Sequence, residues 1–153
     1  MRASRLVLDT HVALEAFLWQ SPRHAALRAA AAAGETQLLA SVETLDEWRR
    51  VLSYSDLKLS AEQQAKALID YQQACLCIAP LLETSALPRC ADPDDQKFLI
   101  LCVAGAATAL LTRDKKLLKI GRHAYYRSRF QTIAPERYIL QDAQAVAGIS
   151  LGS

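Results

Sequence analysis

The sequence predicts an α/β fold, a three-layer α/β/α sandwich with a central, mainly parallel sheet of about five strands. Short apolar segments that suit buried strands alternate along the chain with longer segments whose apolar residues recur at helical spacing. Strands separated by helices form parallel sheets that are covered on both faces. The 153 residues, 52% hydrophobic and 22% charged, suffice for one domain with a sizeable core.

Five segments have the composition of buried strands, because each is a short apolar run bounded by polar residues or glycine. They lie at 5–8, 36–40, 75–79, 107–112 and 130–133. Helical segments separate all five, so each connection is a crossover of the kind that joins parallel strands.

The helices are predicted from apolar spacing together with capping residues. Ser41 is the expected N-cap of the third helix, and Ser60 with Gln63 fits a capping box at the start of the fourth. Asp92 can cap the fifth helix, with Pro93 at its first position. Ser21 is likewise the expected N-cap of the second helix, with Pro22 at its first position. The predicted helices cover 10–19, 22–33, 42–52, 61–73, 93–104, 115–119 and a segment from about Pro135.

Composition predicts a cytoplasmic protein with reduced cysteines. No apolar stretch approaches the roughly 20 residues of a membrane span, and the N-terminus lacks the apolar core of a signal peptide. Cys75, Cys77, Cys90 and Cys102 contain no C-x-x-C pair and have no histidine cluster nearby. Mostly buried thiols are therefore expected rather than a zinc site.

Positive charge is concentrated between Arg113 and Arg129, although the net charge of the chain is only +2. Seven lysines and arginines lie there against one acid, and two tyrosines are interleaved with them. Such a segment can hold phosphates and stack on bases, and taken alone it fits a solvated surface face equally well. The candidate nucleic-acid contacts are Lys115, Lys116, Lys119, Arg122 and, on an earlier helix, Arg49.

Four acidic residues lie near the expected carboxyl ends of the strands. Asp9 ends the first strand and Asp114 follows the fourth, so both should project from the same rim of a parallel sheet. Glu47, one turn into the third helix, and Asp95, in the first turn of the fifth, can face that rim if the strands are neighbours. Clustered carboxylates raise one another's pKa unless a cation neutralises them, and Mg²⁺ or Mn²⁺ prefers such oxygen ligands.

Each acid has an ordinary interpretation when taken singly. Asp9 and Asp114 occupy favoured N-cap positions, and the helix macrodipole favours Asp95. Glu47 lies at the flank of an apolar stripe, where an exposed glutamate is common. The hypothesis of one metal site therefore depends on the set of four and not on any one member.

Four motifs resemble the PIN-domain nucleases, especially the branch of toxin components of toxin–antitoxin systems. The motifs are LVLDTHV, SVETLDEWRRVL, DPDDQKFLILCVAG and ALLTRDKKLL. The resemblance extends over about residues 5–140, and it implies a nuclease domain at 1–140 followed by a C-terminal tail at 141–153.

The resemblance implies a metal-dependent endoribonuclease that acts on single-stranded RNA and is restrained by an antitoxin partner. Asp9, Glu47, Asp95 and Asp114 match the acidic quartet that holds one or two Mg²⁺ or Mn²⁺ ions in this family. Thr112 matches the hydroxyl residue just before the last aspartate, which orients a water or a ligand in such sites.

Two positions depart from the family pattern. His11 stands where the family usually has Asn, so an amide is replaced by an imidazole that can donate, accept or, when neutral, coordinate a metal. Lys116 stands where many members have a second aspartate, so a carboxylate is lost and a cation gained. His11 and Ser41 are expected to support the acidic quartet without belonging to it.

Three other functions stay open. A catalytically weak or inactive member could bind RNA or a protein partner without cutting, and the residues at 11 and 116 favour this alternative. A phosphatase of the haloacid-dehalogenase type also begins with a strand and an aspartate, but it needs a second Asp where His11 stands. A structural or regulatory partner role is also compatible, because the alanine-rich segment 23–33 could form a homodimer seam, although the same segment could simply pack in the core.

Overall fold

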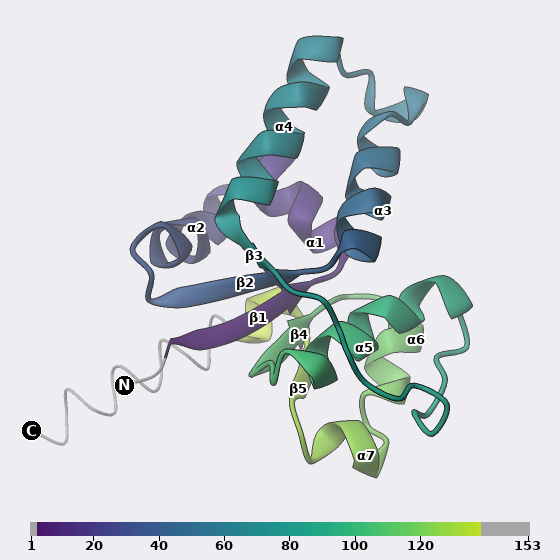
Figure 1. Cartoon of the computed structure of the whole chain (residues 1–153). Helices are drawn as coiled ribbons and strands as arrows, with labels where there is room; N and C mark the ends of the chain where they lie inside the picture. Colours follow the sequence, from purple (N-terminus) through teal and green to yellow (C-terminus); the bar gives the residue numbers. More distant parts are fainter. Residues whose placement is uncertain (1–2, 139–153) are drawn as a thin grey trace, which may run out of the picture.

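The computed structural model describes residues 3–138 and contains the predicted sheet of five parallel strands (Figure 1). The strand order is β3-β2-β1-β4-β5, and every neighbouring pair is parallel. The chain builds the sheet outward from β1 to β3 and then returns to the other side of β1, so the order reverses between β1 and β4. The strands are β1 (Ser4–Leu8), β2 (Thr36–Ala40), β3 (Cys75–Cys77), β4 (Ala109–Leu111) and β5 (Gln131–Ile133).

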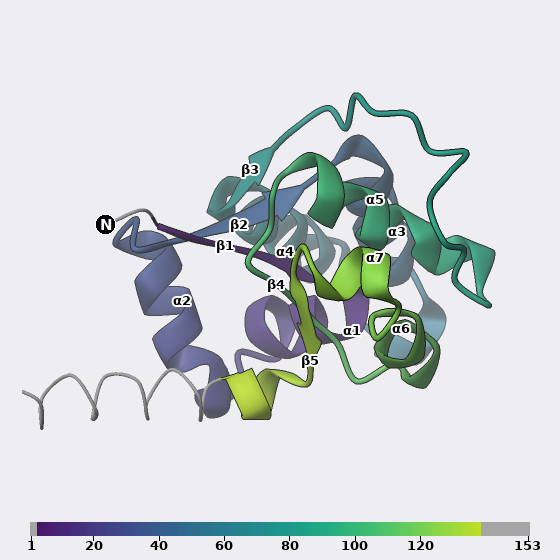
Figure 2. The same cartoon turned by 90° about the horizontal axis from the view of Figure 1, so that it is seen from below.

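Helices cover both faces of this sheet, which makes the three-layer sandwich (Figures 1 and 2). The first four helices lie on one side of the sheet and the last three on the other (Figure 1). The helices are α1 (Thr10–Ala13), α2 (Ala25–Ala32), α3 (Val42–Leu52), α4 (Ala61–Ala74), α5 (Gln96–Ala104), α6 (Lys115–Ile120) and α7 (Ala124–Arg127).

Several predicted boundaries differ from the structure. The predicted helix 10–19 is α1 followed by a π-helical turn at Leu14–Leu18, and the predicted helices 22–33 and 93–104 each open with a 3-10 turn. The strands β3, β4 and β5 are shorter than predicted, because only three residues of each pair with a neighbour. The helix α7 was not predicted, and the predicted helix from Pro135 is described only through residue 138. The predicted tail 141–153 lies outside the described residues.

The predicted caps at Ser41, Ser60 and Asp92 are present. The Ser41 hydroxyl accepts from the Thr44 backbone N–H at 3.3 Å, and Ser60 accepts from that of Gln63 at 3.1 Å. Asp92 caps the 3-10 turn before α5 by accepting from the backbone N–H of Asp94. Ser21 occupies the predicted N-cap position, with Pro22 in the first turn, but its side chain makes no cap hydrogen bond.

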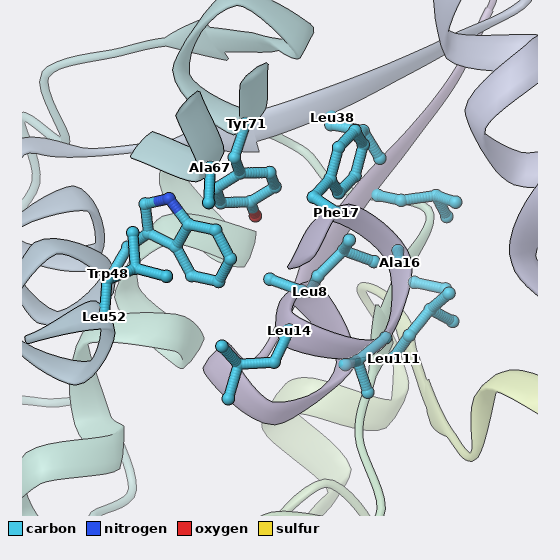
Figure 3. Packing of buried hydrophobic residues seen from close by; sticks show 14 of the residues in the cluster. Leu8, Leu14, Ala16, Phe17, Leu38, Trp48, Leu52, Ala67, Tyr71 and Leu111 are labelled. Atoms are coloured by element: carbon cyan, nitrogen blue, oxygen red, sulfur yellow. The ribbon is translucent and has the colours of Figure 1, made fainter. Parts of the chain in front are cut away.

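Strand residues alternate between two cores, one on each face of the sheet. Leu6 and Leu8 of β1 point into the core beneath α1–α4, and Val7 points into the core beneath α5–α7. Trp48 and Phe17 both pack on Tyr71 in the first core, with ring centroids about 5 Å apart (Figure 3). This packing joins the π-helical turn after α1 to α3 and α4 on the face of the sheet whose strands carry the predicted site at their carboxyl ends.

Other sequence predictions are met in part. The four cysteines are free thiols, and Cys90 and Cys102 are buried, but Cys77 is exposed and Cys75 half-buried. In the alanine-rich helix α2, Leu27 and Ala31 pack against the first core, which matches the packing alternative for that segment. Among the helices of the described chain, none combines the length and apolar character needed to cross a membrane.

Candidate active site

A pocket of about 340 Å³ lies at the carboxyl ends of β1 and β4, where the strand order reverses. Ligands of open parallel sheets bind at such a reversal. All four acids predicted for the site line this pocket, which we call the acidic pocket, although they come from four separate segments of the chain. Its lining residues are Asp9, Thr10, His11, Glu47, Asp95, Phe98, Arg113 and Asp114.

Asp9 is the most buried of the four acids, with 7% of its surface exposed. Its Oδ1 accepts from the Val12 backbone N–H at 2.8 Å, which caps α1, and its Oδ2 accepts from the Thr112 hydroxyl. Burial raises the pKa of Asp9, and these two hydrogen bonds oppose the rise without cancelling it. The ordinary capping role and a place in the acidic pocket are therefore both true of this residue.

Thr112 connects the two aspartates that follow β1 and β4. Its hydroxyl donates to Asp9 and accepts from the Asp114 backbone N–H at 2.9 Å. The Thr112 side chain is fully buried, so water cannot replace either bond. Asp114 in turn caps α6, where its Oδ1 accepts from the backbone N–H groups of Lys116 and Leu117.

Glu47 reaches the acidic pocket from α3 and has two partners there. Its Oε2 accepts from the Thr10 hydroxyl, and its Oε1 lies 2.7 Å from the Lys97 ammonium. Both charged side chains are largely buried, at 18% and 16% exposed. Sequence reasoning missed Lys97, which follows two residues after Asp95 in the motif DPDDQKF and gave no local signal of a partner on α3.

Asp95 differs from the other three acids because it has no side-chain hydrogen bond or ion pair to any described residue. Its pKa is raised to about 6, first by burial and then by the negative charges of Asp114, Asp92, Glu47 and Asp9. This mutual repulsion is the behaviour expected of clustered carboxylates without a cation.

The donor types of the acidic pocket fit a hard divalent ion, because carboxylate oxygens are what Mg²⁺ and Mn²⁺ prefer. The side chains are nevertheless not gathered into a coordination site: within residues 3–138, no three His, Cys, Asp or Glu side chains stand close enough together to hold a metal ion. Three of the four acids are bonded to the protein instead, through Thr112, Thr10, Lys97 and the amides of α1 and α6.

The two supporting residues predicted from the sequence lie in different places. His11 lines the acidic pocket, is 62% exposed, and has its Nε2 3.6 Å from Glu15. Ser41 does not line the pocket. It is buried and caps α3, the helix that carries Glu47.

Arg113, the first residue of the basic segment, is a second cation at the acidic pocket and was not among the predicted site residues. Its guanidinium lies 2.5 Å from Glu15 and 2.9 Å from Glu136, so its charge is already paired. Burial would raise the pKa of Glu15, but the bonds from Arg113 and His24 outweigh burial and lower it. Through these ion pairs, Arg113 connects Glu15 in the turn after α1 to Glu136 in the segment after β5, beside the acidic pocket.

The basic segment 113–129 does not form one surface. Lys115 and Lys116 are exposed at the start of α6, next to the acidic pocket. Arg49 lines a separate hollow with Asp94 and Lys97. A larger hollow of about 940 Å³ runs along the edge strand β5, and we call it the arginine groove after the four arginines that line it. These are Arg122, Arg127, Arg129 and Arg137.

In the arginine groove, Arg129 is held by Tyr125. Its guanidinium lies 3.7 Å from the centroid of the tyrosine ring and donates to the tyrosine carbonyl oxygen at 2.6 Å. Among residues 3–138, Glu136 is the one acid that lines the groove, and it is paired with Arg113. The groove therefore presents a surplus of positive charge.

Comparison with known proteins identifies the family of the chain. A family model described as the PIN domain matches residues 5–116, a span that includes all four acids of the pocket but is shorter than the resemblance expected from the motifs. No curated protein matches the chain. The match covers well over half of the sequence, and the structure has the five-stranded parallel sheet expected for this fold. The chain belongs to the PIN domain family, whose members are generally nucleases.

Proposed function

We propose that the protein is a metal-dependent endoribonuclease that hydrolyses phosphodiester bonds of single-stranded RNA in the cytoplasm. The observation that carries this proposal is the acidic pocket, where Asp9, Glu47, Asp95 and Asp114 meet at the reversal point of the sheet. Four separate segments of the chain supply these acids. Helix capping explains two of them but not why all four line one hollow.

The four carboxylates are the residues that would hold one or two Mg²⁺ or Mn²⁺ ions. Such ions, when bound, lower the pKa of an attacking water and neutralise negative charge on the phosphoryl oxygens. Asp95 would gain most from a cation, because burial and the neighbouring acids already disfavour its charged form.

Other residues of the pocket would orient this machinery. The Thr112 hydroxyl keeps the Asp9 carboxylate and the start of α6 in a fixed relation. Glu15 and Glu136 hold the Arg113 guanidinium at the pocket, where it would face the negatively charged substrate.

The RNA backbone would extend from the acidic pocket towards Lys115, Lys116 and Lys119 and along the arginine groove. Contacts of lysine and arginine with phosphates give affinity without sequence choice. The arginine groove favours this assignment because Arg122 and Arg127 have no side-chain hydrogen bond or ion pair to any residue in the described range.

Cleavage assays with single-stranded RNA test the proposal directly. Asp9→Asn and Asp95→Asn should each lower the cleavage rate by about 10³-fold or more, because the lost charge can no longer hold a divalent ion. Asp46→Asn is the matched control, because Asp46 is exposed on α3 and lies outside the acidic pocket. The products should carry a 5′-phosphate and a 3′-hydroxyl.

Wild-type cleavage in excess EDTA, or full activity of both pocket variants, would contradict the metal assignment. Cleavage of single-stranded DNA at the same rate would contradict the choice of RNA. The assignment as a toxin predicts that production of the wild-type protein slows cell growth and that production of Asp95→Asn does not. The proposal includes an antitoxin protein that restrains the nuclease and a homodimer of the chain.

A catalytically weak or inactive RNA-binding protein is the second candidate. Two observations favour it. The Glu47 carboxylate is already paired with the Lys97 ammonium, and no three His, Cys, Asp or Glu side chains of the described chain are grouped closely enough to hold a metal ion. This candidate predicts RNA binding that Arg122→Ala weakens, together with no cleavage above the Asp95→Asn background at any Mn²⁺ concentration.

A further inference from the structure

Lys97 lines the hollow next to the acidic pocket, together with Arg49 and Asp94, and places a positive charge against Glu47 of the pocket. Its ammonium lies 2.7 Å from Glu47 Oε1 and also donates to the backbone carbonyl of Asp94. The Phe98 ring covers it at 5.4 Å from the ring centroid. With 16% of its side chain exposed, Lys97 is not a solvated surface lysine, and its partner Glu47 is equally enclosed.

Within the described part of the chain, Lys97 is the one side-chain cation that is paired with any of the four acids. The other partners of these acids are neutral: the hydroxyls of Thr10 and Thr112 and the amides that begin α1 and α6. A neutral donor can stay in place when a carboxylate also takes a cation on its remaining lone pairs. An ammonium cannot, because it repels a divalent ion that approaches the same oxygen.

We propose that Lys97 is an internal counterion that competes with the divalent ion for Glu47 and so determines the metal affinity of the site. The inference rests on the proposed function, since it assumes that the acidic pocket takes a divalent cation. Lys97 is a positioning residue in this role. It withdraws from Glu47 when the ion binds, and the enclosed carboxylate thus exchanges one cation for another and is never left uncompensated.

Removal of the competing charge should therefore strengthen metal binding. Calorimetric titration of Mn²⁺ into the RNA-free protein should show about tenfold tighter binding for Lys97→Met than for the wild type. Lys97→Arg keeps the positive charge and should bind Mn²⁺ like the wild type. A lysine that served only to stabilise the fold would leave the Mn²⁺ dissociation constant of a folded variant unchanged.

Lys115→Met is the matched control. Lys115 follows Asp114 directly at the edge of the pocket, so this variant removes the same charge without touching Glu47. Its Mn²⁺ affinity should rise by about twofold at most, because the exposed charge is screened. An equal gain in Lys115→Met and Lys97→Met would overturn the proposal in favour of a general charge effect.

A double-mutant cycle keeps the test decisive if Lys97→Met is unstable. In the background Glu47→Gln, the change at Lys97 should no longer tighten Mn²⁺ binding, because the shared carboxylate is gone. Lys97→Gln, which can still donate to the Asp94 carbonyl, provides the same comparison with a gentler change. Thermal melts establish that each titrated variant is folded.

The outcomes separate this inference from the proposed function. Wild-type binding of Mn²⁺ with equal or weaker binding by Lys97→Met and Lys97→Gln would overturn the counterion role and leave the metal site standing. No Mn²⁺ binding by the wild type with binding by Lys97→Met would support it in its strongest form. No binding by any variant would contradict both proposals.

Discussion

The acidic pocket and the arginine groove hold opposite charges in opposite ways. In the acidic pocket, Asp9 and Glu47 are enclosed, and each of their carboxylate oxygens has a partner within the protein. In the arginine groove, Arg122 and Arg127 are exposed and lack side-chain partners in the described range. The groove's own acid, Glu136, is paired from outside by Arg113.

The difference separates two tasks that a nuclease performs. Enclosed carboxylates are ordered by the fold, which suits chemistry at a fixed place. Their burial and then their mutual repulsion cost stability and raise the pKa of Asp95. Exposed guanidinium groups cost the fold little, because water solvates them, and they attract a phosphate backbone over its length. The loss of stability that comes with ordered, enclosed charges is therefore confined to the acidic pocket.

The largest effect expected from this comparison is on stability, at the residue that ties the pocket together. Thr112→Val removes a buried hydroxyl that donates to Asp9 and accepts from the Asp114 backbone. Because both partners lose a bond away from water, the free energy of unfolding should fall by about 1–3 kcal/mol. Urea denaturation in EDTA measures this change.

Thr132→Val in β5 is the matched control for that prediction. The Thr132 hydroxyl lies buried at the arginine groove and has no hydrogen-bond partner among the residues that the structure describes. The same substitution should therefore be neutral or slightly stabilising there. Equal losses at Thr112 and Thr132 would mean that the bonds of the pocket contribute no more than general packing does.

The next largest effect is on RNA affinity, which should depend on the arginine groove. The double variant Arg122→Ala and Arg127→Ala should weaken binding of single-stranded RNA by about tenfold near 0.1 M salt, because two phosphate contacts are lost. The slope of log affinity against log salt should become shallower by about 1.4 for the same reason. Fluorescence anisotropy in EDTA measures both without cleavage.

Lys58→Ala with Lys66→Ala is the control for total charge. Both lysines are exposed: Lys58 lies just before α4 and Lys66 lies within it. The helix α4 covers the face of the sheet away from α6 and α7 (Figure 1). The pair removes as much charge as the groove variant but should change RNA affinity by less than about twofold, since screening is strong at that distance. An equal loss of RNA affinity in both double variants would mean that net charge, and not the arginine groove, determines RNA binding.

The smallest effect expected is the pH dependence of stability that comes from Asp95. Its pKa in the folded protein is about 6, above its usual value of 3.8, so the folded state binds the proton more tightly than the unfolded state does. The resulting stabilisation is complete below pH 3.8 and is lost as the pH rises through 6.

Asp95→Asn should therefore stabilise the metal-free protein by about 1 kcal/mol at pH 7.5, a value discounted for the partial exposure of the side chain. The gain should vanish near pH 4, where the wild-type carboxyl is also neutral. Urea denaturation in EDTA at the two pH values tests the sign. A variant that is less stable than the wild type at pH 7.5 would show that the acids do not repel one another as described.

Local patterns in the sequence were enough to predict the fold class and the positions of the four acids. The alternation of strand and helix patterns implies a parallel sheet, and such a sheet brings the ends of all strands to one rim. Asp9 directly follows β1 and Asp114 stands three residues after the end of β4, so their meeting at the acidic pocket required only that these strands be neighbours. Capping explains the same two residues, and for that reason the sequence alone left both interpretations open.

The partners of those acids were decided by tertiary structure. Lys97 and Glu47 are 50 positions apart in the printed sequence, and Glu15 and Arg113 are separated by 98, so no helical or strand period relates them. The division of the basic segment also depended on folding, because α6, α7 and β5 turn its side chains towards different hollows. Periodicity and capping act over a few residues, and they determined the elements of this protein. The pairing of buried charges depends on where packed elements cross, which only the folded chain specifies.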